Sequence, residues 1–257
     1  MTCKICKSKT SELFEAEILH KYFVKYFYCD NCGFLSTEEP YWLAEAYTSV
    51  INASDTGIMH RNTFFSILTT NVIYYLFNHN KTFLDYAADF GIFVRLMRDN
   101  GFNFKWQGKY ATNLLARGFE HNNEEEVELV TAFEVFEHFT NPLNELEEIL
   151  KTSKNILFST ELLPKTIPDP KNWWYFGLNH GQHVSFYSKK TLQYLANKHG
   201  LNYYTNGSSL HLFTNKNINS TLFKLLIANK ISYILYIWPR INLHSKIWED
   251  HILLDNK

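Results

Sequence analysis

Apolar and polar positions follow two different patterns along this chain. Between residues 82 and 160, short apolar runs with the length of buried strands alternate with segments that have helical spacing. Strands that alternate with helices of about ten residues are typical of a parallel sheet covered on both faces. The pattern predicts strands at 82–87, 102–107, 127–133 and 155–160, and helices at 92–99, 113–117 and 142–151. The sequence therefore predicts an α/β fold.

The flanking regions complete this division of the chain. Helical spacing recurs at 41–47, 62–77 and 189–199, and the last of these precedes two strands, 201–205 and 209–214, around Asn206-Gly207. Residues 216–257 are basic and aromatic, and we expect a helical tail that packs on the sheet or forms a dimer contact. The predicted domains are a cysteine module (1–37), a helical connector (38–80), the α/β domain (81–215) and the tail (216–257).

Composition narrows the class of protein. The chain is 46% hydrophobic and 17% aromatic, which argues against disorder. A net charge of −1 gives no sign of the basic surface that a general nucleic-acid partner requires. No apolar signal region follows the first lysines, and the longest charge-free late apolar run, 231–239, is far shorter than the roughly 20 residues of a membrane span. We expect a cytoplasmic protein with no membrane partner and no nucleic-acid partner; its oligomeric state is open.

All four cysteines lie in two C-x-x-C pairs, Cys3 with Cys6 and Cys29 with Cys32. Two such turns can aim four thiolates at one tetrahedral zinc ion, and a closed four-cysteine site is structural. Two disulfides are the alternative, although nothing indicates an oxidising compartment. The aromatic segment between the pairs predicts a hairpin, and Gly33 suits a tight turn with positive φ. Zinc ribbons also occur in nucleic-acid binders, but residues 1–37 hold five lysines against four acidic residues, which does not fit that class.

Three segments carry a resemblance to a known family. The segment 84–91, Leu-Asp-Tyr-Ala-Ala-Asp-Phe-Gly, resembles the first motif of class I S-adenosylmethionine (SAM)-dependent methyltransferases, and 132–139, Ala-Phe-Glu-Val-Phe-Glu-His-Phe, followed by Asn141-Pro142-Leu143, resembles a later strand-end motif. The cysteine module and His180-Gly181-Gln182-His183 with Phe186-Tyr187-Ser188 resemble bacterial enzymes that have a zinc-binding N-terminal domain. Relatives of those enzymes include C-methyltransferases that act on nucleotide-linked deoxysugars.

The resemblance implies a Rossmann-like methyltransferase sheet of seven strands, with SAM bound beyond the carboxyl ends of the strands. In the family, glycines let the first turn approach the cofactor, and an acidic residue after the second strand holds the ribose. The resemblance places cofactor-binding residues at Asp85, Tyr86, Ala87, Asp89, Gly91, Lys109, Tyr110, Phe133 and Glu134.

This chain departs from the family pattern at two points. The family's glycines correspond to Ala87 and Asp89, so only Gly91 remains in the turn. Alanine is tolerated there if φ is negative, and Asp89 could cap the following helix. Gly108 stands where the family has the ribose-binding carboxylate. Two hypotheses follow: an active enzyme with an altered pocket, or a descendant that keeps the fold but not the cofactor.

Candidate catalytic residues follow the later motifs. Glu137 and His138 lie just beyond a predicted strand, and His180 and His183 lie in a loop that follows Trp173, Trp174, Tyr175 and Phe176. Histidine suits general base catalysis, and the four aromatic residues could exclude water from a substrate. A second metal at His180 and His183 is an alternative, but no acidic residue nearby in the sequence completes the ligand set.

The function predicted from the sequence is methyl transfer from SAM to a small acceptor, a sugar or nucleotide-linked sugar. The alternative is a non-catalytic binding or scaffold protein with the same fold.

Overall fold

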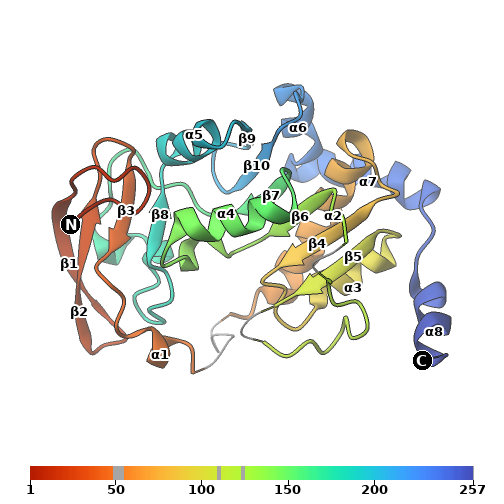
Figure 1. Ribbon diagram of the computed structural model, residues 1–257, viewed down its shortest axis with the longest axis horizontal. Helices are drawn as coiled ribbons and strands as arrows, with labels where there is room; N and C mark the ends of the chain where they lie inside the picture. Colours follow the sequence, from red (N-terminus) through yellow and green to blue (C-terminus); the bar gives the residue numbers. More distant parts are fainter. Residues whose placement is uncertain (49–54, 109–110, 123–124, 257) are drawn as a thin grey trace. The chain divides into compact units, whose positions relative to one another are not determined.

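The computed structural model describes residues 1–48, 55–108, 111–122 and 125–256 (Figure 1). The chain forms two compact units, each assembled from three segments. Unit 1 contains Met1–Asn52, Phe133–Leu150 and Phe158–Asn215, and unit 2 contains Ala53–Ala132, Lys151–Leu157 and Lys216–Lys257. Because the units are interleaved along the chain, each collects residues that are distant in sequence. The domain boundaries expected from the sequence stay predictions.

The N-terminal sheet of unit 1 has four strands in the order β1-β2-β3-β8. These are β1 (Ser11–Ile18), β2 (Tyr22–Tyr28), β3 (Phe34–Thr37) and β8 (Ser185–Tyr187). The hairpin predicted between the cysteine pairs is confirmed, because β1 pairs antiparallel with β2. The fourth strand comes from far along the chain: Phe34 of β3 lies opposite Tyr187 of β8. The cysteine module is therefore tied to the segment that immediately follows His183.

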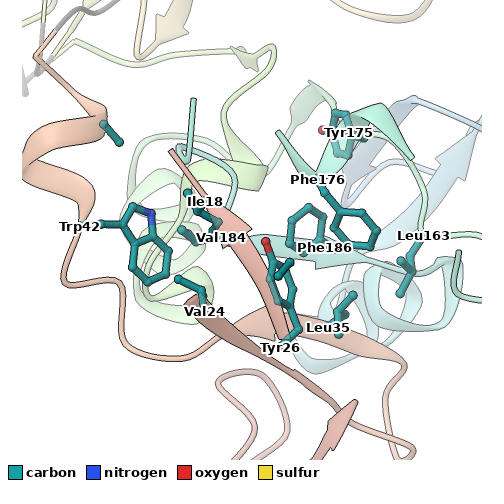
Figure 2. Close-up of a cluster of buried hydrophobic side chains, with 12 residues drawn as sticks. Ile18, Val24, Tyr26, Leu35, Trp42, Leu163, Tyr175, Phe176, Val184 and Phe186 are labelled. Carbon is teal, nitrogen blue, oxygen red and sulfur yellow. The ribbon is translucent and has the colours of Figure 1, made fainter. Parts of the chain in front are cut away.

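An aromatic core lies beneath this sheet (Figure 2). The rings of Tyr26 and Phe186 lie in one cluster with Tyr175 and Phe176. Tyr175 is 1% exposed and Phe176 is fully buried, whereas Trp174 is 74% exposed. The expected cover of four substrate-facing aromatic residues is therefore wrong for Tyr175 and Phe176, because burial against the N-terminal sheet satisfies these two rings.

The second sheet has six strands in the order β5-β4-β6-β7-β10-β9. Its strands are β4 (Thr82–Tyr86), β5 (Asn103–Gln107), β6 (Leu129–Ala132), β7 (Ile156–Ser159), β9 (Asn202–Thr205) and β10 (Leu210–Thr214). Strand β4 pairs in parallel with β5 and β6, whereas β10 pairs antiparallel with β9. All residues of β6 and β7 are buried, as expected for strands covered on both faces. The α/β fold with a mostly parallel sheet is confirmed.

The expected seventh strand and the helix at 113–117 are not present in the described part of the chain. Between β5 and β6 the only pairing with the sheet in 111–122 is an isolated parallel bridge from Glu120 to Trp106. The amides of Leu114 and Leu115 both donate to the carbonyl of Phe90, and the side chain of Asn113 accepts from Ala116 N–H. These bonds compete with helical hydrogen bonds, so the segment forms a loop.

The described part of the chain also contains α-helices of 4 to 19 residues. They are α1 (Leu43–Ala46), α2 (Ile58–Leu76), α3 (Ile92–Asp99), α4 (Pro142–Thr152), α5 (Lys189–Lys198), α6 (Ser220–Leu226), α7 (Asn229–Asn242) and α8 (Ile247–Asp255). Short 3-10 turns are η1 (Phe136–His138), η2 (Pro170–Asn172) and η3 (Trp174–Phe176). The helical tail is confirmed. No single helix within the described ranges has the length and apolarity to cross a membrane; α6 and α7 meet that test only as a pair, with an 85° bend between them.

Within unit 2, the tail helices pack on helices of the α/β core. The buried amide of Asn71 in α2 donates to the carbonyls of Leu226 and Ser232. Arg98 in α3 forms a two-bond ion pair with Asp250 of α8, at 2.7 and 2.6 Å, and both side chains are almost fully buried. Helix α3 begins at Ile92, with Gly91 of the preceding turn as its N-cap, and the Arg98 ion pair to α8 lies in its last turn.

Candidate active site

The four cysteine sulfurs converge at one point in unit 1. Cys3 Sγ lies 3.6 Å from Cys32 Sγ, and Cys6 Sγ lies 3.4 Å from Cys29 Sγ. All four thiols are free, so the disulfide alternative is not supported. Zinc–sulfur bonds of about 2.3 Å in a tetrahedron hold the sulfurs about 3.8 Å apart, close to the distances found here. The arrangement matches the requirements of a four-cysteine metal site.

Gly33 has the conformation expected of it. Its φ is +74°, and its N–H donates to the carbonyl of Cys29 at 2.7 Å. A Cβ at this position would lie 2.4 Å from Ser188 Oγ, so a side chain would need the loop to move. Glycine is required here for both conformation and space.

The turn between β4 and α3 keeps a backbone shape that normally calls for glycine. Ala87 has φ +59°, Asp89 has φ +37° and Gly91 has φ +85°. Ala87 therefore does not meet the condition of negative φ under which alanine is tolerated here, and its left-handed conformation costs about 1–2 kcal/mol. Asp89 does not cap α3, because the N-cap residue is Gly91 and no side chain bonds to the helix start. Ala87 and Asp89 replace two of the expected glycines, but positive φ, which glycine adopts most readily, is present at both positions and at Gly91.

The side chain of Trp106 leaves little space for a side chain at position 108, which is glycine. The indole Nε1–H donates to the carbonyl of Asp89 at 2.9 Å, which ties β5 to the turn. A Cβ on Gly108 would lie 2.3 Å from Cζ2 of the same ring. The ring therefore fills the space that an aspartate at 108 would need. Lys109 and Tyr110, the next two expected cofactor-binding residues, lie outside the described residues.

Asp85 lies at the carboxyl end of β4, followed by Tyr86, the last residue of the strand. The Asp85 side chain is 6% exposed and accepts a hydrogen bond from Thr131 Oγ1 at 2.7 Å. Burial raises the pKa of Asp85 to about 8, and the hydrogen bond from Thr131 offsets only part of that effect. This carboxyl is thus kept protonated at neutral pH by its surroundings.

The segment after β6 supplies further expected site residues, all in unit 1. Phe133 and Glu134 directly follow the strand. Glu134 has φ +55°, and Ser159 holds it there: Ser159 Oγ accepts from Glu134 N–H at 2.7 Å and donates to Glu134 Oε1 at 2.5 Å. A strained non-glycine residue held by such bonds is typical of a functional site. No local pattern in the sequence indicates that Ser159 holds Glu134.

Glu137, His138 and His183 form a compact cluster. One ligand-type atom from each lies within 4.8 Å of the others. The rings of His138 and His183 have centroids 5.0 Å apart, and His180 lies beside His183 at 4.7 Å. The structure therefore brings together the four residues predicted as catalytic, although two of them are more than 40 positions away from the others.

Hydrogen bonds set the tautomers of the histidines. His183 Nδ1 lies 2.6 Å from the carbonyl of Tyr175, and His138 Nδ1 lies 3.1 Å from the carbonyl of Gln182. A carbonyl only accepts, so a bond to it requires the proton on Nδ1 and leaves the lone pair on Nε2. For His138 the Tyr47 hydroxyl, 3.0 Å from the same Nδ1, is then a second acceptor. His180 is the opposite case: its Nδ1 accepts from Gln182 N–H at 3.2 Å, so its proton is on Nε2.

Burial shifts the titration of this cluster. Burial, with repulsion from Glu134, raises the pKa of Glu137 well above its usual value. Burial lowers the pKa of His138 to about 4, and burial together with the neighbouring His138 and His180 lowers the pKa of His183 well below its usual value. All three groups are held in their neutral forms at neutral pH.

Residues near the N-terminus hold the histidine loop in place. Trp42 Nε1–H donates to the carbonyl of Gly181 at 2.7 Å, and the Gln182 amide donates to the carbonyl of Ala46 at 2.9 Å. The Tyr47 hydroxyl lies 3.0 Å from His138 Nδ1. These positioning residues could not be predicted from the sequence, because no local pattern connects residues 42–47 with a loop more than 130 positions away.

A family model described as a methyltransferase domain matches residues 60–206, more than half of the chain. No curated protein sequence matches the chain.

Among solved structures, TnmH is 14% identical with a TM-score of 0.48, and the match covers 69% of this chain and 62% of that protein. CalO1, a methyltransferase in calicheamicin biosynthesis in its SAH-bound form, is 11% identical with a TM-score of 0.40, and the match covers 62% and 56% of the two chains. LepI in complex with SAM is 14% identical with a TM-score of 0.41, with coverage of 58% and 46%. The chain thus spans less than two thirds of each of these three proteins.

The family match includes β4, the turn at 87–91, the cluster residues Glu137 and His138, and the histidine loop. On the strength of that match, this chain belongs to the methyltransferase-domain family.

Proposed function

We propose that the protein transfers a methyl group from SAM to a small acceptor. The observation that carries this proposal is the turn after β4, where Ala87, Asp89 and Gly91 all have positive φ. A turn that had lost its ligand would have no reason to keep two strained non-glycine residues, and strain of this kind persists where function requires it. The alternative of a non-catalytic scaffold is not favoured by this turn or by the acid–histidine cluster.

The fit to the cofactor differs between its two ends. The turn at 87–91 has positive φ at three residues, a conformation that glycine adopts most readily. By this turn and by resemblance, our candidates for the turn side of the site are Asp85, Tyr86, Ala87, Asp89 and Gly91. The ribose end does not follow the family pattern, because position 108 is glycine and the Trp106 ring lies where the Cβ of a larger residue at 108 would be. By resemblance, Lys109, Tyr110, Phe133 and Glu134 complete the set. When bound, SAM supplies a methyl group activated on a sulfonium.

The cluster of Glu137, His138 and His183 is our candidate for activating the acceptor. One ring nitrogen of each histidine and one carboxyl oxygen lie within 4.8 Å of one another, and the cluster is largely buried, with His183 9% exposed. Such groups act on a nucleophile by taking its proton or by increasing its acidity. A sugar or nucleotide-linked sugar acceptor is supported by the resemblance of the histidine loop and the cysteine module to the sugar C-methyltransferase relatives.

We also propose a structural zinc ion at Cys3, Cys6, Cys29 and Cys32. Four free thiols at near-tetrahedral distances support it, and with four protein ligands no position is open for substrate. The ion would stabilise the N-terminal sheet whose last strand, β8, adjoins the histidine loop.

Substitution of His183 tests the proposed function. We expect His183→Ala to lower turnover about 10²- to 10⁴-fold, the usual contribution of a group that activates the nucleophile, with unchanged SAM affinity. The measurement is transfer of an isotope-labelled methyl group from SAM to a panel of nucleotide-linked sugars, with His251→Ala, an exposed tail variant, as control. Turnover by His183→Ala equal to that of the wild type would remove His183 from the mechanism.

A further inference from the structure

We propose that Glu137, His138 and His183 bind one divalent transition-metal ion, in addition to the zinc ion proposed at the cysteines. The three residues belong to unit 1, and their ligand-type atoms all lie within 4.8 Å of one another. An ion with bonds of about 2.1 Å to nitrogen and oxygen holds its ligands about 3.0–3.5 Å apart. The upper limit of 4.8 Å exceeds that spacing, so binding of an ion would draw the three side chains together.

Glu137 provides the first independent observation for this site. Its side chain is fully buried, and neither carboxyl oxygen has a hydrogen-bond partner of good geometry. The neighbouring donors are the hydroxyls of Tyr175 and Thr160, which bond to each other at 3.0 Å. Buried carboxyl groups are normally paired, hydrogen-bonded or bound to a metal, because leaving them without a partner is unfavourable. A metal ion between Glu137 and the two histidines would remove this anomaly.

The histidines provide the second observation. His138 and His183 each direct Nδ1 at a backbone carbonyl, that of Gln182 and that of Tyr175. Metal-binding histidines usually donate one ring N–H in this manner, which orients the ring and leaves the other nitrogen as ligand. In both rings the free lone pair is on Nε2, so the tautomers are already those of a metal site.

The same reasoning excludes His180 as a ligand. Its Nδ1 accepts from Gln182 N–H, and its proton is therefore on Nε2. The site has three protein ligands, two nitrogens and one oxygen, and positions on the ion remain open for another molecule. This donor set suits Zn²⁺, Co²⁺ or Fe²⁺ better than Mg²⁺ or Ca²⁺, which prefer oxygen ligands.

A metal-free acid–base pair is the competing explanation. In such a pair the carboxyl group bonds to the imidazole that it orients, as in catalytic triads. Here the orienting bonds come from backbone carbonyls instead, and Glu137 bonds to neither histidine. The hydrogen-bond pattern therefore favours a shared ion over direct proton exchange within the cluster.

The role of the ion rests on the proposed function, although its binding does not. An oxygen bound at an open position of the ion becomes more acidic, as water does on zinc. A ligated acceptor hydroxyl would lose its proton to solvent more readily than a free one. The site would thus select acceptors that present a hydroxyl group, which narrows the proposed sugar class to the oxygen nucleophiles within it.

Cobalt titration of the full-length protein tests the site without donor or acceptor. We expect the zinc-loaded protein to bind one further Co²⁺ per chain by calorimetry. Its visible absorption should lack the intense sulfur-to-metal bands of thiolate ligands. Glu137→Gln preserves shape and His183→Gln removes the second nitrogen ligand; each should weaken Co²⁺ binding about 100-fold. His251→Ala should bind as the wild type does.

Two results would overturn the metal site. One is the absence of any Co²⁺ binding beyond exchange at the cysteines, which the thiolate bands would reveal. The other is wild-type affinity in a folded Glu137→Gln protein, with folding checked by near-ultraviolet circular dichroism. Because neither readout requires turnover, a failure of methyl transfer and a failure of metal binding are distinguishable.

Discussion

Cys29→Ser is expected to abolish zinc binding and to unfold the N-terminal sheet. Structural zinc contributes about 10–16 kcal/mol to the folding of small zinc modules, which equals or exceeds the whole stability of many domains at about 5–15 kcal/mol. The effect should extend to the histidine loop, because β3 pairs with β8 and Trp42 holds Gly181. We therefore expect loss of turnover together with loss of zinc.

Zinc content and thermal unfolding measure this prediction. Wild-type protein should contain one zinc per chain at the cysteines, and a chelator should lower its melting temperature strongly. Lys9→Ala, an exposed change in the same module, should leave both properties unchanged. A zinc-free protein that melts at the wild-type temperature would contradict the structural role of the ion.

The paired change Trp106→Val with Gly108→Asp is expected to tighten SAM binding about 10- to 100-fold. A carboxylate that binds both ribose hydroxyls contributes about 1.5–3 kcal/mol, which corresponds to that range. Gly108→Asp alone should not improve binding, because its Cβ would lie 2.3 Å from Trp106 Cζ2. Valine at 106 preserves the strand while it removes the ring.

Calorimetric titration with SAM compares the wild type, both single variants and the pair. Trp106→Val alone serves as the matched control for loss of the bond to Asp89. Tighter binding by Gly108→Asp alone would show that the ring does not exclude the carboxylate. Equal affinities in the pair and in Trp106→Val would show that position 108 does not contact the ribose.

Local patterns in the sequence identified most of the elements that surround the site. The helix expected at 92–99 matches α3 (Ile92–Asp99), because its apolar spacing and the Asn100-Gly101 stop are local signals. The cysteine pairs could also be recognised locally, because the C-x-x-C spacing of each pair lies within four residues. The helix expected at 113–117 fails because Phe90, distant in sequence, accepts the hydrogen bonds of Leu114 and Leu115.

The candidate site could be predicted only in part from the sequence, because its residues interact with distant parts of the chain. The sequence marked Glu137 and His183 separately, but it offered no acidic partner near His183 because the partner is 46 positions away. It assigned Tyr175 and Phe176 to a cover, since aromatic residues in a core and at a substrate look alike in sequence. Nor did Ala87 reveal its positive φ, which depends on how the turn is held between β4 and α3.

Calorimetric titration of the wild-type protein with SAM and S-adenosylhomocysteine tests the central claim most directly. Both compounds should bind at sub-millimolar concentration, with an affinity reduced by the missing ribose carboxylate. Substitution of Asp85, at the end of β4, should weaken both. Absence of binding heat for both compounds at sub-millimolar concentration, in protein shown to be folded, would contradict methyl transfer from SAM by this chain.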